Sequence, residues 1–261
     1  MSKLKEFTAG FRCHLRGHRL VMTHKLWRFI IIPGLLSLLY FPFVIWATFH
    51  GLRPVSRYLH ENWIPGFLQS AFTLEILTLM VWLLGVYAGF MLFRNAIMVI
   101  CSPLLSHISE IVEKVSGGVE APKFTWEGTG KEIFRASVLS LLSLTISLIV
   151  FVFCLVIGII PLLGAVVSFL IMSLVQMYLA GVGFADPALE RRQYSIGSTL
   201  KFTRKHRPRL MGVGLGFLML LAVPVFGWFI APSYGVIAGT LAVLDLIEEE
   251  KKNRKPPVMP I

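Results

Sequence analysis

The chain has 261 residues, of which 56% are hydrophobic and only 15% are charged, and its net charge is +11. Soluble domains carry about 25% charged residues, so this composition, with a mean hydropathy of +0.74, excludes an ordinary soluble domain and predicts a membrane protein. The basic balance favours anionic lipid or an anionic solute as partner. It does not favour nucleic acid, because the sequence has no aromatic-basic binding module.

The sequence holds no signature of catalysis. It lacks paired carboxylates in an apolar span, a serine elbow, a zinc motif and a phosphate loop. We therefore expect no enzyme activity, no cofactor and no metal. The three cysteines, Cys13, Cys101 and Cys154, form no close pair, so no disulfide framework is expected.

The first 28 residues form a basic leader. Apolar residues recur in it at helical spacing, at Leu4, Phe7, Phe11 and Leu15. This pattern predicts an amphipathic helix that lies at the membrane interface with its cations toward the headgroups.

Two apolar runs of span length follow the leader. We expect the first span over Phe29–Phe49 and the second over Ile76–Phe93, with a short loop over Gly51–Phe72 between them. The second helix is expected to continue to Ile100, before a bend marked by Pro103.

The middle of the chain is more polar. Leu104–Val115 is expected to form a polar helix, and Val119–Gly130 a surface loop. Lys131–Arg135 is expected to begin the next helix.

The longest apolar stretch is Ala136–Ala185, 50 residues without a formal charge. A membrane-spanning helix needs about 20 apolar residues, so this stretch predicts two helices, Val138–Ile159 and Leu163–Leu179. Pro161 and Gly164 lie where the turn of this hairpin would fall.

A second apolar stretch follows a basic helix expected over Ser195–His206. Leu210–Leu244 has 35 residues without a charge, and it fits either a pair of short spans or a hairpin that enters and leaves by the same side. Its small residues, Gly212, Gly214 and Gly216, predict close helix packing. We interpret residues 1–247 as one membrane domain and 248–261 as a charged, proline-containing tail.

The cations predict the sidedness of the chain. Two spans followed by two hairpins place 23 of the 25 lysines and arginines on one face, whether or not the hairpins cross the bilayer fully. The positive-inside rule makes that face cytoplasmic, so we expect both termini in the cytoplasm.

Several segments together resemble the CysZ family of bacterial sulfate permeases and the wider etoposide-induced-protein domain family. The resemblance covers nearly the whole chain and is carried by five places: Gly10-Phe11-Arg12; Lys25-Leu26-Trp27-Arg28-Phe29 with Pro33; Pro103 with Glu110 and Glu113; Asp186-Pro187 with Arg191-Arg192; and Val223-Pro224, Pro232 and Ala238-Gly239-Thr240. It implies an all-α polytopic protein with two long transmembrane helices, two partly penetrating hairpins and an oligomeric assembly. It also implies sulfate uptake for cysteine synthesis across the bacterial inner membrane.

The sulfate motif of that family reads Gly-Leu-Arg-Arg at the entry to the first span. The matching positions here are Lys25, Leu26, Trp27 and Arg28, so the glycine and the first arginine are replaced. One arginine is retained and Lys25 adds a point charge, which predicts an anion site formed with the free amides at the helix start. The alternative is that both cations contact lipid phosphates.

A second set of charges flanks the spans in the middle of the chain: Arg94, Glu110, Glu113, Glu132 and Arg135. In an oligomer these groups would line a polar route for the ion. The alternative is a solvated helix pair whose exposed ion pairs contribute little energy. Asp186 is expected either to cap the next helical turn or to pair with Arg191 or Arg192.

The sequence therefore predicts a membrane permease for a small inorganic oxyanion, sulfate first, that works as a homo-oligomer among anionic lipids. The alternative function is a non-transporting structural or lipid-interacting membrane protein on the same scaffold.

Overall fold

The computed structural model describes residues 2–116, 126–158, 160 and 163–254, and every regular element within these ranges is helical. In chain order the elements are α1 (Lys3–Thr23), α2 (Trp27–Gly51), α3 (Arg53–Trp63), the short 3-10 helix η1 (Gly66–Leu68), α4 (Ala71–Ile100), α5 (Ser102–Val115), α6 (Trp126–Gly158), α7 (Leu163–Glu190), α8 (Ile196–Lys205), α9 (Arg207–Leu221) and α10 (Phe226–Arg254). The predicted all-α class is confirmed.

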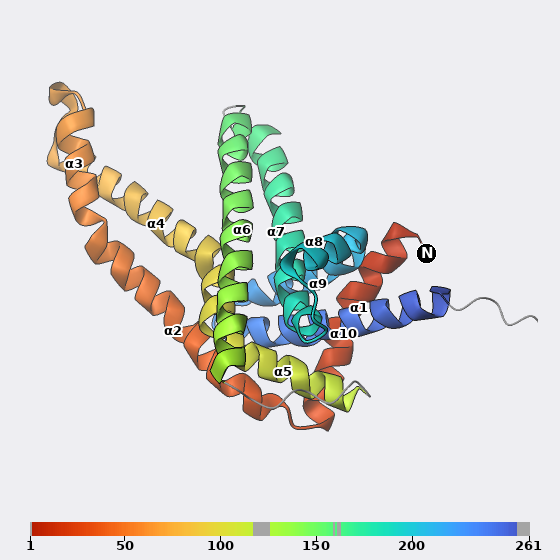
Figure 1. Cartoon of the computed structure of the whole chain (residues 1–261). Helices are drawn as coiled ribbons and strands as arrows, with labels where there is room; N and C mark the ends of the chain where they lie inside the picture. Colours follow the sequence, from red (N-terminus) through yellow and green to blue (C-terminus); the bar gives the residue numbers. More distant parts are fainter. Residues whose placement is uncertain (1, 117–125, 159, 161–162, 255–261) are drawn as a thin grey trace, which may run out of the picture.

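Two projections rise in the same general direction from a common base (Figure 1). One projection is the arm of α2, α3 and α4, and the other is the hairpin of α6 and α7. The base, which we call the basal layer, consists of α1, α5, α8, α9 and α10. The start of α1 and the end of α10 both lie in this layer (Figure 1). The distribution of the cations along the sequence predicts this placement of both ends on one side.

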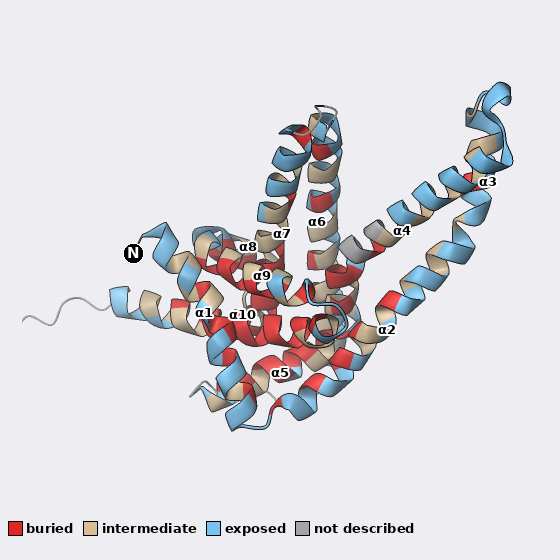
Figure 2. Cartoon of the chain, turned by 180° about the vertical axis from the view of Figure 1, so that it is seen from behind, coloured by how far each residue is buried: buried red, intermediate tan, exposed pale blue. Residues whose placement is uncertain are grey.

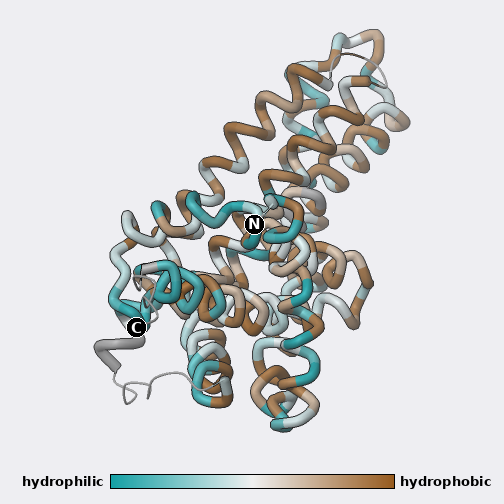
Figure 3. Tube along the Cα trace, turned by 90° about the vertical axis from the view of Figure 1, so that its right-hand side faces the viewer, coloured by the Kyte–Doolittle hydropathy of each residue, from teal (hydrophilic) through white to brown (hydrophobic). Residues whose placement is uncertain are grey.

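Within the described residues, four helical segments are long and apolar enough to cross a membrane: Trp27–Trp63, Gly130–Gly158, Leu163–Glu190 and Phe226–Asn253. A fifth is added if Leu92–Ile100 and Ser102–Val115, bent by 77° at their junction, are one broken span. The apolar residues run along both projections in Figure 3. The predicted hairpin in the long charge-free stretch and the bend near Pro103 are both confirmed, while Ile159, Pro161 and Leu162 of the hairpin turn lie outside the described residues.

The two kinds of apolar helix differ in what surrounds them. Only 11% of the apolar window of α6 is buried within the protein, against 78% for α10. Figure 2 shows the same contrast between an exposed projection and a buried base. The second apolar stretch therefore forms α9 and α10 as a hairpin inside the basal layer, where its apolar groups make the core.

Close contacts between helices in the basal layer depend on glycine. A Cβ atom at Gly212 would clash with the Phe7 carbonyl oxygen of α1, and one at Gly214 would clash with the Met177 carbonyl oxygen of α7. The predicted packing role of these glycines is confirmed. The buried face of α1 consists of Gly10, Cys13, His14, Gly17 and Val21. Leu4 and Leu15 of its predicted interfacial apolar face are 72% and 61% exposed and stay outside the packed core.

Ion pairs join both ends of the chain to α9. The Arg209 guanidinium is 2% exposed and lies 2.8 Å from Glu6 of α1 and 2.9 Å from Glu249 of α10. Lys205 of α8 lies 2.5 Å from Glu250. These contacts explain why the tail predicted from residue 248 is helical as far as Arg254; the remaining residues lie outside the described part.

Two predicted loops are partly helical. Half of Gly51–Phe72 is the helix α3, which begins beside Pro54 and is held to α4 by a hydrogen bond from Thr78 to Ser56 of 3.0 Å. The predicted loop Val119–Gly130 is helical from Trp126, where α6 begins, and residues 117–125 lie outside the described part. The basic helix after the hairpin is confirmed as α8, and the hydroxyl of Ser195 caps it by accepting from the Ser198 amide at 3.2 Å.

Candidate functional site: a cationic turn and a buried charge network

The predicted anion-binding residues form the turn between α1 and α2. Lys25 has φ of 55°, in the left-handed region that glycine prefers. Leu26 is buried and anchors the turn, and its amide donates to the Val21 carbonyl at 3.0 Å. Lys25, Trp27 and Arg28 are exposed. The left-handed φ gives a physical reason for the glycine that the sulfate motif has at this position.

The start of α2 has the polarity that an anion needs. Leu26 is its N-cap and makes no side-chain capping hydrogen bond, so the positive end of the helix dipole is uncompensated there. The Arg28 guanidinium lies 5.8 Å from the centre of the Trp27 ring. Neither Lys25 nor Arg28 has a carboxylate partner among the described residues, which leaves both cations available to an external anion.

The second predicted set of charges does not form one network. Arg135 of α6 binds Asp186 of α7, with Nη2 2.6 Å from Oδ1 and Nε 3.1 Å from Oδ2. The same guanidinium donates to the hydroxyl of Thr199 at 2.7 Å and to the carbonyl of Tyr194 at 2.5 Å. It therefore fastens α6, α7 and α8 together at the base of the hairpin.

Asp186 neither caps a helical turn nor pairs with Arg191 or Arg192, so both expectations for it are wrong. Helix α7 continues through Asp186 to Glu190, and the carboxylate is turned toward Arg135. Asp186 and Arg135 are 51 positions apart in the chain, and no local spacing pattern reports such a contact.

Glu113 forms a separate buried cluster. It accepts from Arg192 at 2.6 Å and from Arg191 at 3.1 Å, and Arg191 also donates to the Ser106 carbonyl at 3.0 Å. These contacts fasten α5 to the end of α7. Because Glu113 is 4% exposed, the alternative of a solvated ion pair does not describe this site.

The other three members of the set have different surroundings. Glu110 pairs within α5, with Lys114 at 2.7 Å and with His107 at 3.3 Å, and half of each partner side chain is exposed. Glu132 accepts from the Ser106 hydroxyl at 3.2 Å. Only Glu110 fits the solvated alternative.

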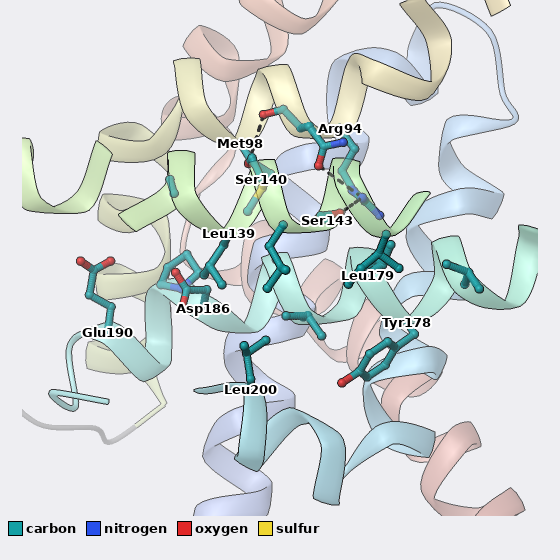
Figure 4. Close-up of a pocket in the computed structure, with 18 of the residues that line it drawn as sticks. Arg94, Met98, Leu139, Ser140, Ser143, Tyr178, Leu179, Asp186, Glu190 and Leu200 are labelled. Carbon is teal, nitrogen blue, oxygen red and sulfur yellow. Dashed lines mark hydrogen bonds between the residues drawn. The ribbon is translucent and has the colours of Figure 1, made fainter. Parts of the chain in front are cut away.

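Arg94 stands apart from the other charges. It is buried on α4, donates to the Ser143 hydroxyl, and lies 3.3 Å from both the Asn95 amide oxygen and the Gln176 carbonyl oxygen. No carboxylate pairs with it among the described residues. Arg94 lines a cavity of about 580 Å³ between α4, α5, α6, α7, α8 and α9, on the side opposite Tyr178 and Leu200 (Figure 4).

Comparison with known proteins agrees with this architecture. Residues 13–232 match the family described as sulfate transporter CysZ/etoposide-induced protein 2.4, and no curated protein matches the chain. The matched family is of a transporter type and not an enzyme type, which supports a permease-like role in general. The match includes the cationic turn, both buried charge clusters and the α6–α7 hairpin. The chain is a multi-pass helical membrane protein and belongs to the sulfate transporter CysZ/etoposide-induced protein 2.4 family.

Proposed function

We propose that this permease moves a small inorganic oxyanion, sulfate first, across the bacterial inner membrane. The observation that carries the proposal is the cationic turn of Lys25 and Arg28 at the uncapped start of α2. Two cations without carboxylates beside a positive helix end attract an anion. The protein works as a homo-oligomer, with the basal layer and both termini on the cytoplasmic side.

The replaced motif positions change the chemistry of capture. The backbone turn that a glycine would make is kept by Lys25 in its left-handed conformation. Arg28 supplies a planar fork of donors, whereas Lys25 supplies a point charge. This combination suits a small doubly charged oxyanion, although it has fewer directed donors than two arginines would offer.

In this proposal the buried clusters are supports of the hairpin and not the route of the ion. The donors of Arg135 are taken by Asp186, Thr199 and Tyr194, and Glu113 is held by two arginines. Charged groups whose hydrogen bonds are already made to other side chains bind a passing ion poorly. Within the predicted set, Arg94 is the member that a polar route would use, because it is buried without a carboxylate.

The second candidate function is lipid interaction without transport. Trp27 is 49% exposed and lies beside the Arg28 guanidinium. Tryptophan next to a cation is typical of anchors at the level of the lipid headgroups, so the same turn suits a lipid phosphate.

Uptake of radiolabelled sulfate into proteoliposomes separates the two functions. We expect uptake by the wild type and its loss in Arg28→Ala. The matched control is Arg53→Ala. Arg53 of α3 also lies over an aromatic ring, 4.7 Å from the centre of the Phe49 ring of α2, and we expect this variant to transport normally.

Binding of sulfate to the purified protein, measured by calorimetry, completes the test. Arg28→Ala should abolish the binding. If correctly inserted wild-type protein neither binds nor transports sulfate or another oxyanion, the permease proposal is wrong and lipid interaction is favoured.

A further inference from the structure

The cavity beside the hairpin has a cationic side and an apolar body. Its volume of about 580 Å³ is in the range of small-molecule sites, roughly 300–1,000 Å³. Figure 4 shows Arg94 and Ser143 on one side, Tyr178 and Leu200 on the other, and Leu139 and Leu179 between them. A ligand that fills this space must satisfy apolar walls and a concentrated positive charge.

Apart from the buried Arg94 on the opposite side, the positive charge of the cavity comes from part of the basic segment after the hairpin. Seven cations lie between Gly183 and Arg209. Four of them pair with carboxylates, namely Arg191, Arg192, Lys205 and Arg209.

The remaining three cations, Lys201, Arg204 and Arg207, have no carboxylate partner among the described residues, and all three line the cavity. They are exposed, and the Arg207 guanidinium lies 5.0 Å from the centre of the Tyr178 ring. Within this segment, the cations that lack a carboxylate partner therefore gather at the cavity, where they suit an external anion.

The apolar body of the cavity extends along the membrane hairpin. Leu142 and Ile146 of α6 and Leu174 of α7 line it, and these side chains are 36%, 36% and 51% exposed. A small hydrated anion at the cations would leave these groups uncovered. A ligand with an anionic head and a hydrocarbon tail would cover both parts at once.

Two carboxylates also line the cavity, and they do not oppose such a ligand at the cationic side. Asp186 is neutralised by Arg135, 2.6 Å away, and Glu190 lies 4.0 Å from the same guanidinium. Figure 4 shows both acids at the end of the cavity away from Tyr178.

We propose that this cavity binds one anionic phospholipid. The phosphate lies against Lys201, Arg204 and Arg207, and one acyl chain lies along Leu142, Ile146 and Leu174 of the hairpin. The site is separate from the cationic turn at Lys25 and Arg28, and the proposal does not depend on transport. The bound lipid fills the space between the hairpin and α8, so it acts as part of the packing there.

Native mass spectrometry of the purified protein in mild detergent tests the site. The probes are phosphatidylglycerol and phosphatidylcholine with identical chains. We expect one phosphatidylglycerol to bind at least about tenfold more tightly than phosphatidylcholine, because each cation near a lipid phosphate contributes to binding. Equal binding of the two lipids would overturn the proposal.

Two triple variants each remove three positive charges, one at the cavity and one elsewhere on the surface. The triple variant Lys201→Gln, Arg204→Gln and Arg207→Gln should lose the preference for phosphatidylglycerol. The control is Arg12→Gln, Arg19→Gln and Lys251→Gln, which replaces three other exposed cations outside the cavity and should keep it. Since all six side chains are exposed, both variants should fold, and equal effects of the two triples would overturn the site.

Two further experiments test the contributions of the acyl chain and of the phosphate headgroup separately. Val175→Trp fills the apolar body and should reduce retention of both lipids, whereas Val152→Trp, on the exposed face of α6 away from the cavity, should not. Inorganic phosphate at millimolar concentration should not displace the bound phosphatidylglycerol. Displacement by phosphate would show a free-anion site instead of a lipid site.

Discussion

Lys25 has a left-handed backbone conformation that disfavours any residue with a Cβ atom. The turn persists because Leu26 is buried beside it and because helices on both sides fix its ends. The strain is thus maintained by tertiary contacts at a place where a cation is presented to the surface. A side chain with a useful charge has been kept at a local cost in backbone energy.

This cost leads to a prediction for Lys25→Gly. The substitution should raise the free energy of unfolding by about 1 kcal/mol, because glycine removes the left-handed strain, although part of the gain is offset by the greater entropy of glycine in the unfolded chain. Lys25→Ala, which removes the charge and keeps the strain, should leave it nearly unchanged. Thermal unfolding in detergent measures both, and a stability gain in the alanine variant alone would contradict the strain.

His14 couples the stability of the basal layer to pH. It is buried where α1 packs on Gly216 of α9, and burial lowers its pKa to about 4 from an ordinary 6.5. Below pH 6.5 the imidazole of His14 takes up a proton in the unfolded chain, whereas in the folded protein it stays neutral until about pH 4. The free energy of unfolding therefore decreases as the pH falls from 6.5 to about 4.

We expect the wild type to lose on the order of 2 kcal/mol between pH 7 and pH 5 from this group. In His14→Leu the loss should be smaller by that amount, measured as the shift in thermal midpoint. Between pH 7 and pH 8, where the imidazole is neutral in both states, the two proteins should differ by a constant. A variant with the same slope below pH 6.5 as the wild type would rule out His14 as the cause.

At the scale of the element, helix α9 is defined by its glycines. A methyl group at Gly214 would overlap the Met177 carbonyl oxygen, which belongs to the backbone of α7 and cannot rotate away. Gly214→Ala should therefore destabilise the protein by more than about 2 kcal/mol or prevent its purification as a folded species.

Gly130 supplies the matched control for this prediction. It lies in α6 with nothing within 4 Å of the position of a Cβ atom. Gly130→Ala should be neutral or should stabilise by up to about 1 kcal/mol through its helix propensity. Equal stability of the two variants in thermal unfolding would show that α7 and α9 are not in close contact.

The junction of α6, α7 and α8 depends on one buried ion pair. Asp186→Asn removes the carboxylate that binds the buried Arg135 guanidinium and leaves only Glu190, 4.0 Å away, as a counter-charge. Removal of one partner of a buried pair costs about 3–5 kcal/mol. Lys114→Gln, which breaks the half-exposed pair with Glu110, should cost less than about 1 kcal/mol. Unfolding midpoints compare the two, and a smaller effect of Asp186→Asn would mean that water reaches the pair.

The sequence predicts the helices better than it predicts the side-chain contacts between them. The α6–α7 hairpin is readable because a charge-free run of twice the span length allows one main interpretation. Helix α3 was missed because Arg53 and Pro54 resemble a turn locally, whereas its contact with Thr78 of α4 is a tertiary property. The Arg135–Asp186 pair was missed for the same reason, and the cavity between α6 and α8 has no pattern in the chain at all.

For the whole molecule, the distribution of apolar surface separates the projections from the base. Exposed apolar side chains cover the hairpin and the arm, whereas the apolar groups of α9 and α10 face other helices. The composition of the two charge-free stretches, Ala136–Ala185 and Leu210–Leu244, predicts that both lie in lipid. Burial by protein and burial by lipid select the same residue types, so composition does not separate them. The basal layer is therefore the part that fixes the relative positions of the two projections.

This arrangement predicts the sidedness of three surface positions in every molecule. Lys3 at the start of α1 and Ser198 in α8 lie in the basal layer, and Gly66 lies at the far end of the arm (Figure 1). Cysteine substituted at Lys3 and at Ser198 should react with a membrane-impermeant maleimide from the same side, and cysteine at Gly66 from the opposite side.

The native cysteines give a low background in this experiment. Cys13, Cys101 and Cys154 are all buried, and burial raises the pKa of the Cys13 thiol to about 12, so little reactive thiolate is present. If the protein inserts in both orientations, the labelled fractions at Lys3 and Ser198 should still be equal, and the fraction at Gly66 should be their complement. Unequal fractions at Lys3 and Ser198 would place α1 and α8 on different sides of the membrane, which one layer of packed helices does not permit.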